Sequence, residues 1–196
     1  MIQQLRSAPN LLTLLRLMFI PLAVIAVLDN HYIWALGIFI VAGISDGLDG
    51  LLARLLEQKT VLGQYLDPIA DKLLLSTMFL VLATMHKIPW SVTVLVFSRD
   101  IIIVIVCSLL YATGLLRVFQ PSWWGKANTV AQIVTVPLVL LREISSAHWI
   151  AVAKRAGIGV TIGLTVFSGV HYVLRVAFEL RGANTKADAG KTAVGS

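Results

Sequence analysis

Four aspartates lie close together in the sequence and could bind metal ions. The chain has only ten acidic residues among 196, and four of them fall within one stretch: Asp46, Asp49, Asp67 and Asp71. Carboxylates brought this near to one another repel unless cations lie between them. Oxygen ligands suit Mg²⁺, Mn²⁺ or Ca²⁺, and the absence of nearby Cys and His argues against zinc. These residue types therefore predict a divalent metal site.

The spacing predicts that two helices present these carboxylates. In a helix the first two aspartates, with Gly50, Ala53 and Arg54, follow one another at i, i+3, i+4, i+7 and i+8 and share one face. The other two aspartates are four residues apart and share a face of the next helix. We expect a short connection containing Gly63 to join the two helices in antiparallel order.

The first of these helices also has groups suited to a phosphate. Gly50 removes a side chain where a bulky ligand could approach the backbone, and Arg54 could hold a phosphate with two hydrogen bonds. Carboxylates, a divalent metal and an arginine together suit a pyrophosphate and the transfer of a phosphoryl-type group. The alternative is that the acids only cap helices or pair with Arg54, Lys59 and Lys72.

The elements that must position this cluster are apolar. Hydrophobic residues make up 58% of the chain and charged residues only 13%. A soluble globular protein has no place to bury so much apolar surface. The composition therefore excludes a soluble enzyme and a disordered chain, and the single Cys107 excludes a secreted disulfide scaffold.

Six apolar stretches have about the length that crosses a bilayer. They run approximately over Leu11–Leu28, Tyr32–Leu55, Pro68–Met85, Ser91–Leu115, Lys126–Leu141 and Ile150–Leu180. We therefore predict an all-α integral membrane protein with six transmembrane helices, the first of them kinked at Pro21. Residues 1–181 form one membrane domain in this prediction, and the small, polar segment 182–196 is a disordered tail.

The charge balance predicts the orientation. Sixteen basic residues against ten acidic ones give a net charge of +6, but the basic residues lie between apolar runs, which favours membrane topology and anionic lipids over nucleic acid. The basic residues of the N-terminal side are Arg6, Arg54, Lys59, Arg117, Lys126, Arg181, Lys186 and Lys191, against Lys87, Arg142, Lys154 and Arg155 opposite. Both termini and the acidic cluster are therefore expected on the cytoplasmic side of a bacterial-type cell membrane.

The acidic cluster resembles the motif of a known family. The pattern Asp46-x2-Asp49-Gly50-x2-Ala53-Arg54-x8-Gly63-x3-Asp67-x3-Asp71 is similar to the complete motif of the CDP-alcohol phosphatidyltransferases, as is the six-helix layout. The resemblance implies a CDP-alcohol phosphotransferase fold and two divalent cations, Mg²⁺ or Mn²⁺, bound by the four aspartates. It also implies that Asp71 is the general base and that Gly50, Ala53 and Arg54 contact the CDP group.

The resemblance further implies the reaction. CDP-diacylglycerol would donate its phosphatidyl group to the hydroxyl of an acceptor alcohol, and CMP would leave. A small phosphorylated acceptor, glycerol 3-phosphate, is the first expectation. Membrane lipids and a second copy of the chain, as a homodimer, are the other expected partners.

Further residues are expected around this site. Asn10 and Thr13 fit a helix N-cap and first turn, but they also resemble a family segment that contributes, with Asp49 and Gly63, to the nucleotide site. The acceptor-binding candidates are Arg99, Lys126 and Arg175, with His171 as a weaker one. A charge such as Arg99 in the middle of an apolar helix should face the bundle interior.

Two alternatives remain from the sequence. Asp100 follows Arg99 where phosphatidylglycerophosphate synthases commonly have Glu, and Arg-Asp is common in the cardiolipin synthases of the same family, whose acceptor is phosphatidylglycerol. A cation transporter would also place carboxylates in the membrane. The clustering of the acids toward one membrane face, without a visible inverted repeat, disfavours a transporter.

Overall fold

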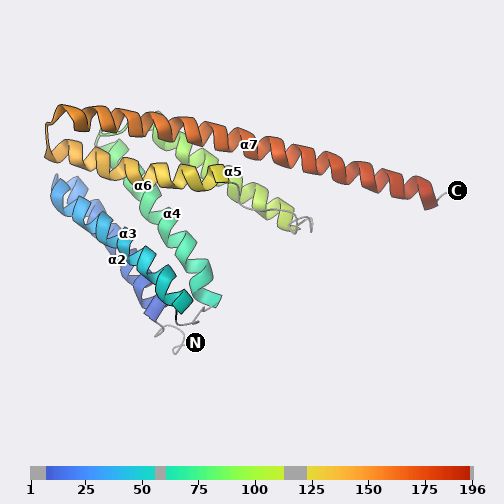
Figure 1. The fold of residues 1–196 in the computed structure, drawn as a ribbon, viewed down its shortest axis with the longest axis horizontal. Helices are drawn as coiled ribbons and strands as arrows, with labels where there is room; N and C mark the ends of the chain where they lie inside the picture. Colours follow the sequence, from blue (N-terminus) through green and yellow to red (C-terminus); the bar gives the residue numbers. More distant parts are fainter. Residues whose placement is uncertain (1–7, 56–60, 113–122, 195–196) are drawn as a thin grey trace.

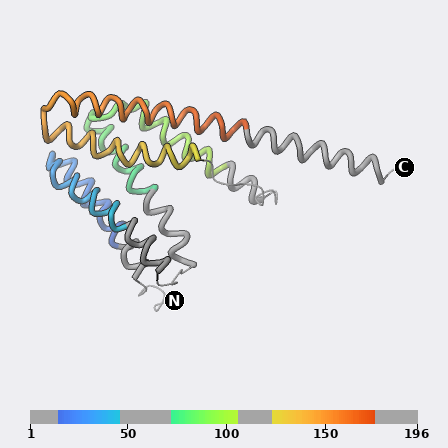
Figure 2. Tube along the Cα trace, in the orientation of Figure 1, coloured from blue at the N-terminus to red at the C-terminus, as the bar shows by residue number. Residues whose placement is uncertain are grey.

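Six helices make up the part of the chain that the structure describes. The structure is a computed structural model that describes residues 8–55, 61–112 and 123–194, with side chains for 15–45, 72–105 and 123–174, which are coloured in Figure 2. The helices are α2 (Ala8–Leu28), α3 (Tyr32–Leu55), α4 (Val61–Thr84), α5 (Trp90–Ala112), α6 (Trp123–Ile144) and α7 (His148–Val194), labelled in Figure 1. The all-helical fold is thus confirmed for these residues.

Three helix boundaries differ from the predictions. α4 begins at Val61, so Gly63 lies in its first turn and not in a connection. The N–H groups of a first turn have no intrahelical partner, so a glycine destabilises the helix less there than in its middle. α2 begins at Ala8, so Asn10 is a first-turn residue and not an N-cap, and the helix continues through Pro21. α7 continues to Val194, where we expected a disordered tail; alanines and lysines favour a helix there.

Two helices end in the same capping geometry. Asn30 and His86 have positive φ angles of 62° and 58° directly after α2 and α4. In each case the next residue donates a backbone hydrogen bond across five positions, from His31 to Ala26 and from Lys87 to Leu82, both at 2.8 Å. This is the Schellman motif, which satisfies carbonyl groups left unpaired at a helix end.

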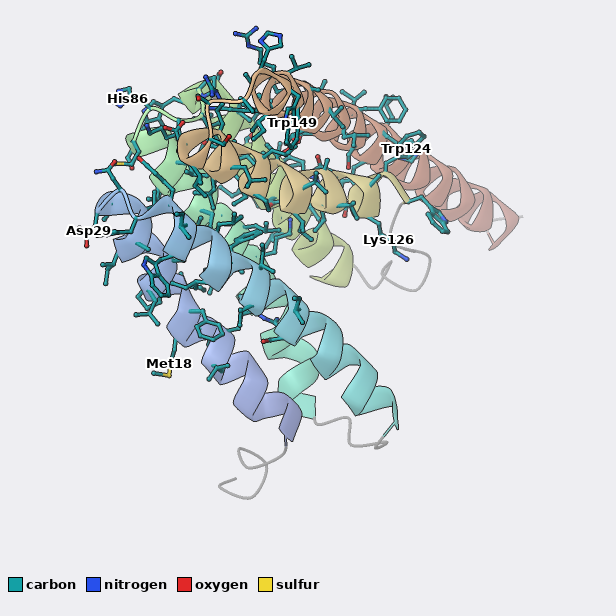
Figure 3. All side chains as sticks on the ribbon, turned by 60° about the vertical axis from the view of Figure 1, so that its left-hand side comes forward. Met18, Asp29, His86, Trp124, Lys126 and Trp149 are labelled. Carbon is teal, nitrogen blue, oxygen red and sulfur yellow. The ribbon has the colours of Figure 1, made fainter. Side chains whose placement is uncertain are left out.

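The core lies around α4, which packs against α2, α5 and α6. Figure 1 shows α2 beside α3 and α6 beside α7 as two pairs that α4 joins. The interior contains apolar side chains of different sizes, such as Ala23, Leu82 and Phe79, each fully buried. Many large apolar side chains instead face outward, including Met18 (Figure 3) and Trp34. A bilayer is the solvent that accommodates such a surface.

A buried polar seam joins α6 to α7. The hydroxyls of Thr135 and Thr161 lie 2.9 Å apart, and Thr165 donates to Asn128 Oδ1 at 2.8 Å. A Cβ added at Gly157 would lie 3.1 Å from Thr135 Oγ1, so the helices approach closely at this glycine. Hydroxyls and small residues at a helix contact are typical of helices that pack inside a membrane.

Two stretches of the described residues are long and apolar enough to cross a membrane. They are Trp123–Ile144 in α6 and His148–Leu174 in α7. Three further apolar stretches, in α2, α3 and α4, are shorter and border residues whose side chains lie outside the described ones: Leu15–Leu28, Tyr32–Ser45 and Lys72–Thr84. These findings indicate a membrane protein and leave the six spans as a prediction.

Candidate active site

The aspartate motif lies on α3 and α4. α3 contains Asp46, Asp49, Gly50, Ala53 and Arg54, and α4 contains Gly63, Asp67 and Asp71. The helical backbone gives the first set the predicted helical spacing, and both helices pack against α2 and α6. The side chains of all eight residues lie outside the described ones, so the metal site, the general base and the CDP contacts stay predictions.

α2 contains two further candidate residues and a buried charge. Asn10 and Thr13 are in its first two turns, with side chains outside the described part. Arg16, one turn after Thr13, is fully buried. A long basic side chain on the outside of a membrane helix commonly extends to the surface. Arg16 instead lies inside the helix bundle.

Arg99 is buried in α5 and is held by two neighbours. Its Nη1 donates to Asp100 Oδ1 at 2.8 Å and its Nη2 to Ser168 Oγ on α7 at 3.1 Å. The Lys72 ammonium donates to both oxygens of Asp100, each at 2.8 Å. The expectation that Arg99 faces the interior is confirmed. Its links to Asp100 and Ser168, and the link of Asp100 to Lys72, were not predicted from the sequence.

The start of α6 reaches the same turn of α7. Trp124 packs edge-on against Phe167 with ring centroids 4.6 Å apart, and Phe167 stacks near His171 at 6.4 Å. Lys126, two residues after Trp124, is exposed, and its Nζ lies 5.4 Å from the Trp123 ring centroid (Figure 3). Phe167 adjoins the Ser168 that holds Arg99, so α7 places the Lys126 end of α6 near Arg99.

The remaining acceptor candidate also lies on α7. Arg175 is seven residues, or about two helical turns, after Ser168. Its side chain lies outside the described ones. The neighbouring His171 is half-buried, and its Nδ1 has no hydrogen-bond partner in the described structure. Arg99 of α5 thus bonds α7 directly, and the start of α6 meets α7 through Trp124.

Two buried amide side chains follow Lys126 on α6. Asn128 Nδ2 and Gln132 Nε2 are buried and have no partner among the described residues. We did not single out Asn128, Gln132 or Ser168 as binding residues from the sequence. A signal was present: Thr161, Thr165 and Ser168 recur at i, i+4 and i+7, which marks a polar stripe on an apolar helix.

An apolar groove opens beside Arg99. It lies between α5 and α7, has a volume of about 380 Å³, and includes Arg99 and Thr165 among mostly aliphatic lining residues such as Ile102 and Val170. A groove of this kind suits a hydrocarbon chain whose polar end reaches the arginine.

A second charged cluster lies far from the motif. Glu143, near the end of α6, accepts from Lys87 Nζ at 2.6 Å, and Lys154 Nζ is 3.7 Å from its other oxygen. The hydrogen bond to Glu143 raises the pKa of Lys87 above its ordinary value, with burial acting in the opposite direction. Lys87 also lies 5.4 Å from the Tyr32 ring centroid. These contacts join α3, α6 and α7 to the turn after α4.

Comparison with known proteins identifies the class. Residues 6–167 match the family model described as CDP-alcohol phosphatidyltransferase. The chain therefore belongs to the CDP-alcohol phosphatidyltransferase family and is a transferase.

The chain is similar to named relatives over most of its length. It is 35% identical over 184 residues to a Mycobacterium tuberculosis (strain H37Rv) protein named "Probable phosphatidylglycerophosphate synthase", covering 91% of this chain and 85% of the relative. It is 36% identical to the "CDP-diacylglycerol--glycerol-3-phosphate 3-phosphatidyltransferase" of Salmonella choleraesuis, covering 85% and 93%. A "Putative cardiolipin synthase" of Mycobacterium bovis is 35% identical over 70% of this chain and 66% of its own length.

Proposed function

We propose that this enzyme transfers the phosphatidyl group of CDP-diacylglycerol to glycerol 3-phosphate and releases CMP. The family assignment and the relatives named for this reaction support the donor and the acceptor. The structural observation that carries the proposal is the buried Arg99. Its guanidinium bonds Ser168 on α7, and Trp124 at the start of α6 packs against the neighbouring Phe167. Cations from α5 and α6 beside one turn of α7 suit a phosphorylated acceptor.

The chemistry follows from the residue types. The all-oxygen donor set of Asp46, Asp49, Asp67 and Asp71 fits two divalent cations, Mg²⁺ or Mn²⁺. When bound, these ions would neutralise the pyrophosphate and stabilise the leaving CMP. Asp71 accepts the proton of the acceptor hydroxyl, whose oxygen then bonds to the lipid-linked phosphorus while the bond from that phosphorus to the CMP oxygen breaks.

The remaining roles place the two substrates. The CDP group lies against α3 and the start of α2, where the contacting residues are Asn10, Thr13, Asp49, Gly50, Ala53 and Arg54, with Gly63 on α4. The acceptor phosphate is bound by Arg99, Lys126 and Arg175. The diacyl chains of the donor stay in the bilayer.

We also propose a membrane arrangement. Residues 1–181 form one domain of six membrane spans, with 182–196 outside it, and both termini and the active site are cytoplasmic. The apolar outer surface and the two stretches long enough to span support this, together with the excess of basic residues at one end. The functional unit is a homodimer, as in the family that the sequence resembles.

Purified protein tests the function directly. We expect CMP release from CDP-diacylglycerol that requires Mg²⁺ or Mn²⁺ and glycerol 3-phosphate, with little release when serine or inositol phosphate replaces the acceptor. Asp71→Asn should lower kcat by roughly 10²-fold or more, because proton transfer by a placed base contributes this much. Cation transport without CMP release would contradict the proposal, and full activity of Asp71→Asn would contradict the base.

One observation favours a second acceptor. The apolar groove between α5 and α7 reaches Arg99, which is the arrangement that a lipid acceptor such as phosphatidylglycerol would need. Some relatives are named "Putative cardiolipin synthase". Phosphatidylglycerol in place of glycerol 3-phosphate in the same assay separates the two acceptors, and cardiolipin formation at a higher kcat/KM would reverse their order.

A further inference from the structure

Asn128 on α6 is a buried amide with a fixed orientation and an unused donor. Its side chain is fully buried, and its Oδ1 accepts a hydrogen bond from Thr165 of α7 at 2.8 Å. Because the oxygen of the amide faces Thr165, its Nδ2 is directed away from that hydroxyl, and Nδ2 has no partner among the described residues. A buried donor without a hydrogen bond is destabilising, so this position suits a ligand that supplies an acceptor atom.

The same turn of α7 holds both Asn128 and the arginine proposed to bind the acceptor phosphate. Thr165 bonds Asn128, and Ser168, three residues later, accepts from Arg99 Nη2 at 3.1 Å. Residues at i and i+3 are neighbours on one face of a helix. Asn128 and Arg99 are therefore anchored to adjacent hydroxyls, which places the amide beside the guanidinium within the width of a small ligand.

The other neighbours of Asn128 are the two helices of the aspartate motif. Thr129, the next residue of α6, lines a cavity together with Gly43 of α3 and Leu74 of α4. Gly43 and Leu74 are each three residues, less than one helical turn, from the nearest motif aspartate. Asn128 thus lies between Arg99 on one side and the helices that carry the motif on the other.

We propose that Asn128 is a specificity-determining residue that donates a hydrogen bond from Nδ2 to the central hydroxyl of glycerol 3-phosphate. With the acceptor phosphate at Arg99 and the reacting hydroxyl at the motif, the middle carbon must lie between them, where Asn128 is. A neutral amide suits an uncharged hydroxyl, whereas cations suit the phosphate. A site that bonds a substrate hydroxyl rejects analogues without it, because the buried donor then stays unpaired. The inference rests on the proposed function, because it concerns the same acceptor.

An acceptor analogue tests this role in the full-length enzyme. 3-Hydroxypropyl phosphate keeps the phosphate and the terminal hydroxyl of glycerol 3-phosphate and lacks only the central hydroxyl. CMP release over a range of concentrations gives kcat/KM for each acceptor. The wild type should prefer glycerol 3-phosphate by roughly 10- to 100-fold, the effect of leaving one buried donor unpaired. Asn128→Leu has no donor to leave unpaired, so its preference should fall to about threefold or less.

The ratio of the two acceptors separates recognition from simple stabilisation. A variant that only loosens the helices lowers kcat/KM for both acceptors and leaves their ratio unchanged. Thr165→Val keeps the amide of Asn128 and removes only the bond that orients it, so its preference should also fall below that of the wild type. This second variant carries the test if Asn128→Leu does not fold.

Thr135→Val is the matched control. It removes the bond to Thr161, which also joins α6 to α7, but Thr135 is seven residues from Asn128, roughly 10 Å along the helix axis. We expect the wild-type preference to persist in this variant.

Three results would overturn the proposal. They are a wild type that uses both acceptors equally, an Asn128→Leu variant that keeps the full preference, and a Thr135→Val variant that loses it. Gln132→Leu adds a comparison, because Gln132 Nε2 is buried one turn further along α6 and also has no partner among the described residues. Loss of the preference in that variant alone would contradict the role of Asn128. Wild-type enzyme that releases no CMP with glycerol 3-phosphate would instead contradict the proposed function itself.

Discussion

One nitrogen of the buried Arg99 guanidinium has no hydrogen-bond partner among the described residues. This nitrogen is Nε, because Nη1 and Nη2 donate to Asp100 and Ser168. Arg99→Lys keeps the charge but not the planar array of donors. It should raise the KM for glycerol 3-phosphate roughly tenfold, the effect of losing one charge-assisted hydrogen bond, and change kcat less. Initial rates over a range of acceptor concentrations measure both.

Ser168→Ala is the companion to this change. It removes one hydrogen bond that fixes Arg99 and leaves the guanidinium in place, so the KM should rise less than in Arg99→Lys. An unchanged KM in both variants would remove Arg99 from the acceptor site.

At the residue scale, the sequence predicts whether a side chain is buried or exposed better than it predicts which residues that side chain contacts. Arg99 could be recognised because a charge in an apolar helix must face the interior. The partnership of Lys72 with Asp100 spans 28 positions and depends on how α4 and α5 pack, which no local pattern specifies. Ser168 was missed because one hydroxyl in a membrane helix can also bond to its own backbone.

At the scale of elements, the close approach of α6 and α7 depends on Gly157. A Cβ there would meet Thr135 Oγ1 at 3.1 Å and Leu138 Cδ1 at 3.2 Å. Gly157→Leu should therefore force the helices apart and lower stability by about 1–3 kcal/mol, the usual cost of overpacking. Thermal unfolding in detergent, followed by circular dichroism, measures this. Gly163 has no neighbour within 4 Å, so Gly163→Leu is the matched control, and equal melting temperatures would refute the close contact.

The extents of the helices were largely predictable, and their packing was not. Long apolar runs end near the observed helix ends because a bilayer-length helix needs an uninterrupted apolar stretch. The start of α4 was misplaced because the apolar stretch begins only at Pro68 and Gly63 was assigned to a connection, whereas the helix begins at Val61. Which helices pair depends on the buried hydroxyls and amides, whose partners are 26 and 37 positions apart.

At the scale of the whole molecule, the proposed orientation can be tested by labelling. In a Cys107→Ser background, a cysteine replacing Ser146 in the exposed link between α6 and α7 should react with a membrane-impermeant maleimide in intact cells. A cysteine replacing the exposed Trp123 at the other end of α6 should react only after the cells are permeabilised. The reverse pattern would invert the topology and place the motif outside the cytoplasm.

The two bonds of the polar seam have a geometric consequence. Thr135 bonds Thr161, and Asn128 bonds Thr165, so α7 meets α6 at two points separated along both axes. Sliding α7 by one helical turn, about 5.4 Å, would break both bonds and carry Ser168 away from Arg99 by the same distance. Small gradual shifts are penalised because hydrogen bonds fail within a fraction of an ångström. The seam therefore limits α7 to discrete positions along α6 and so fixes the height at which Ser168 meets Arg99.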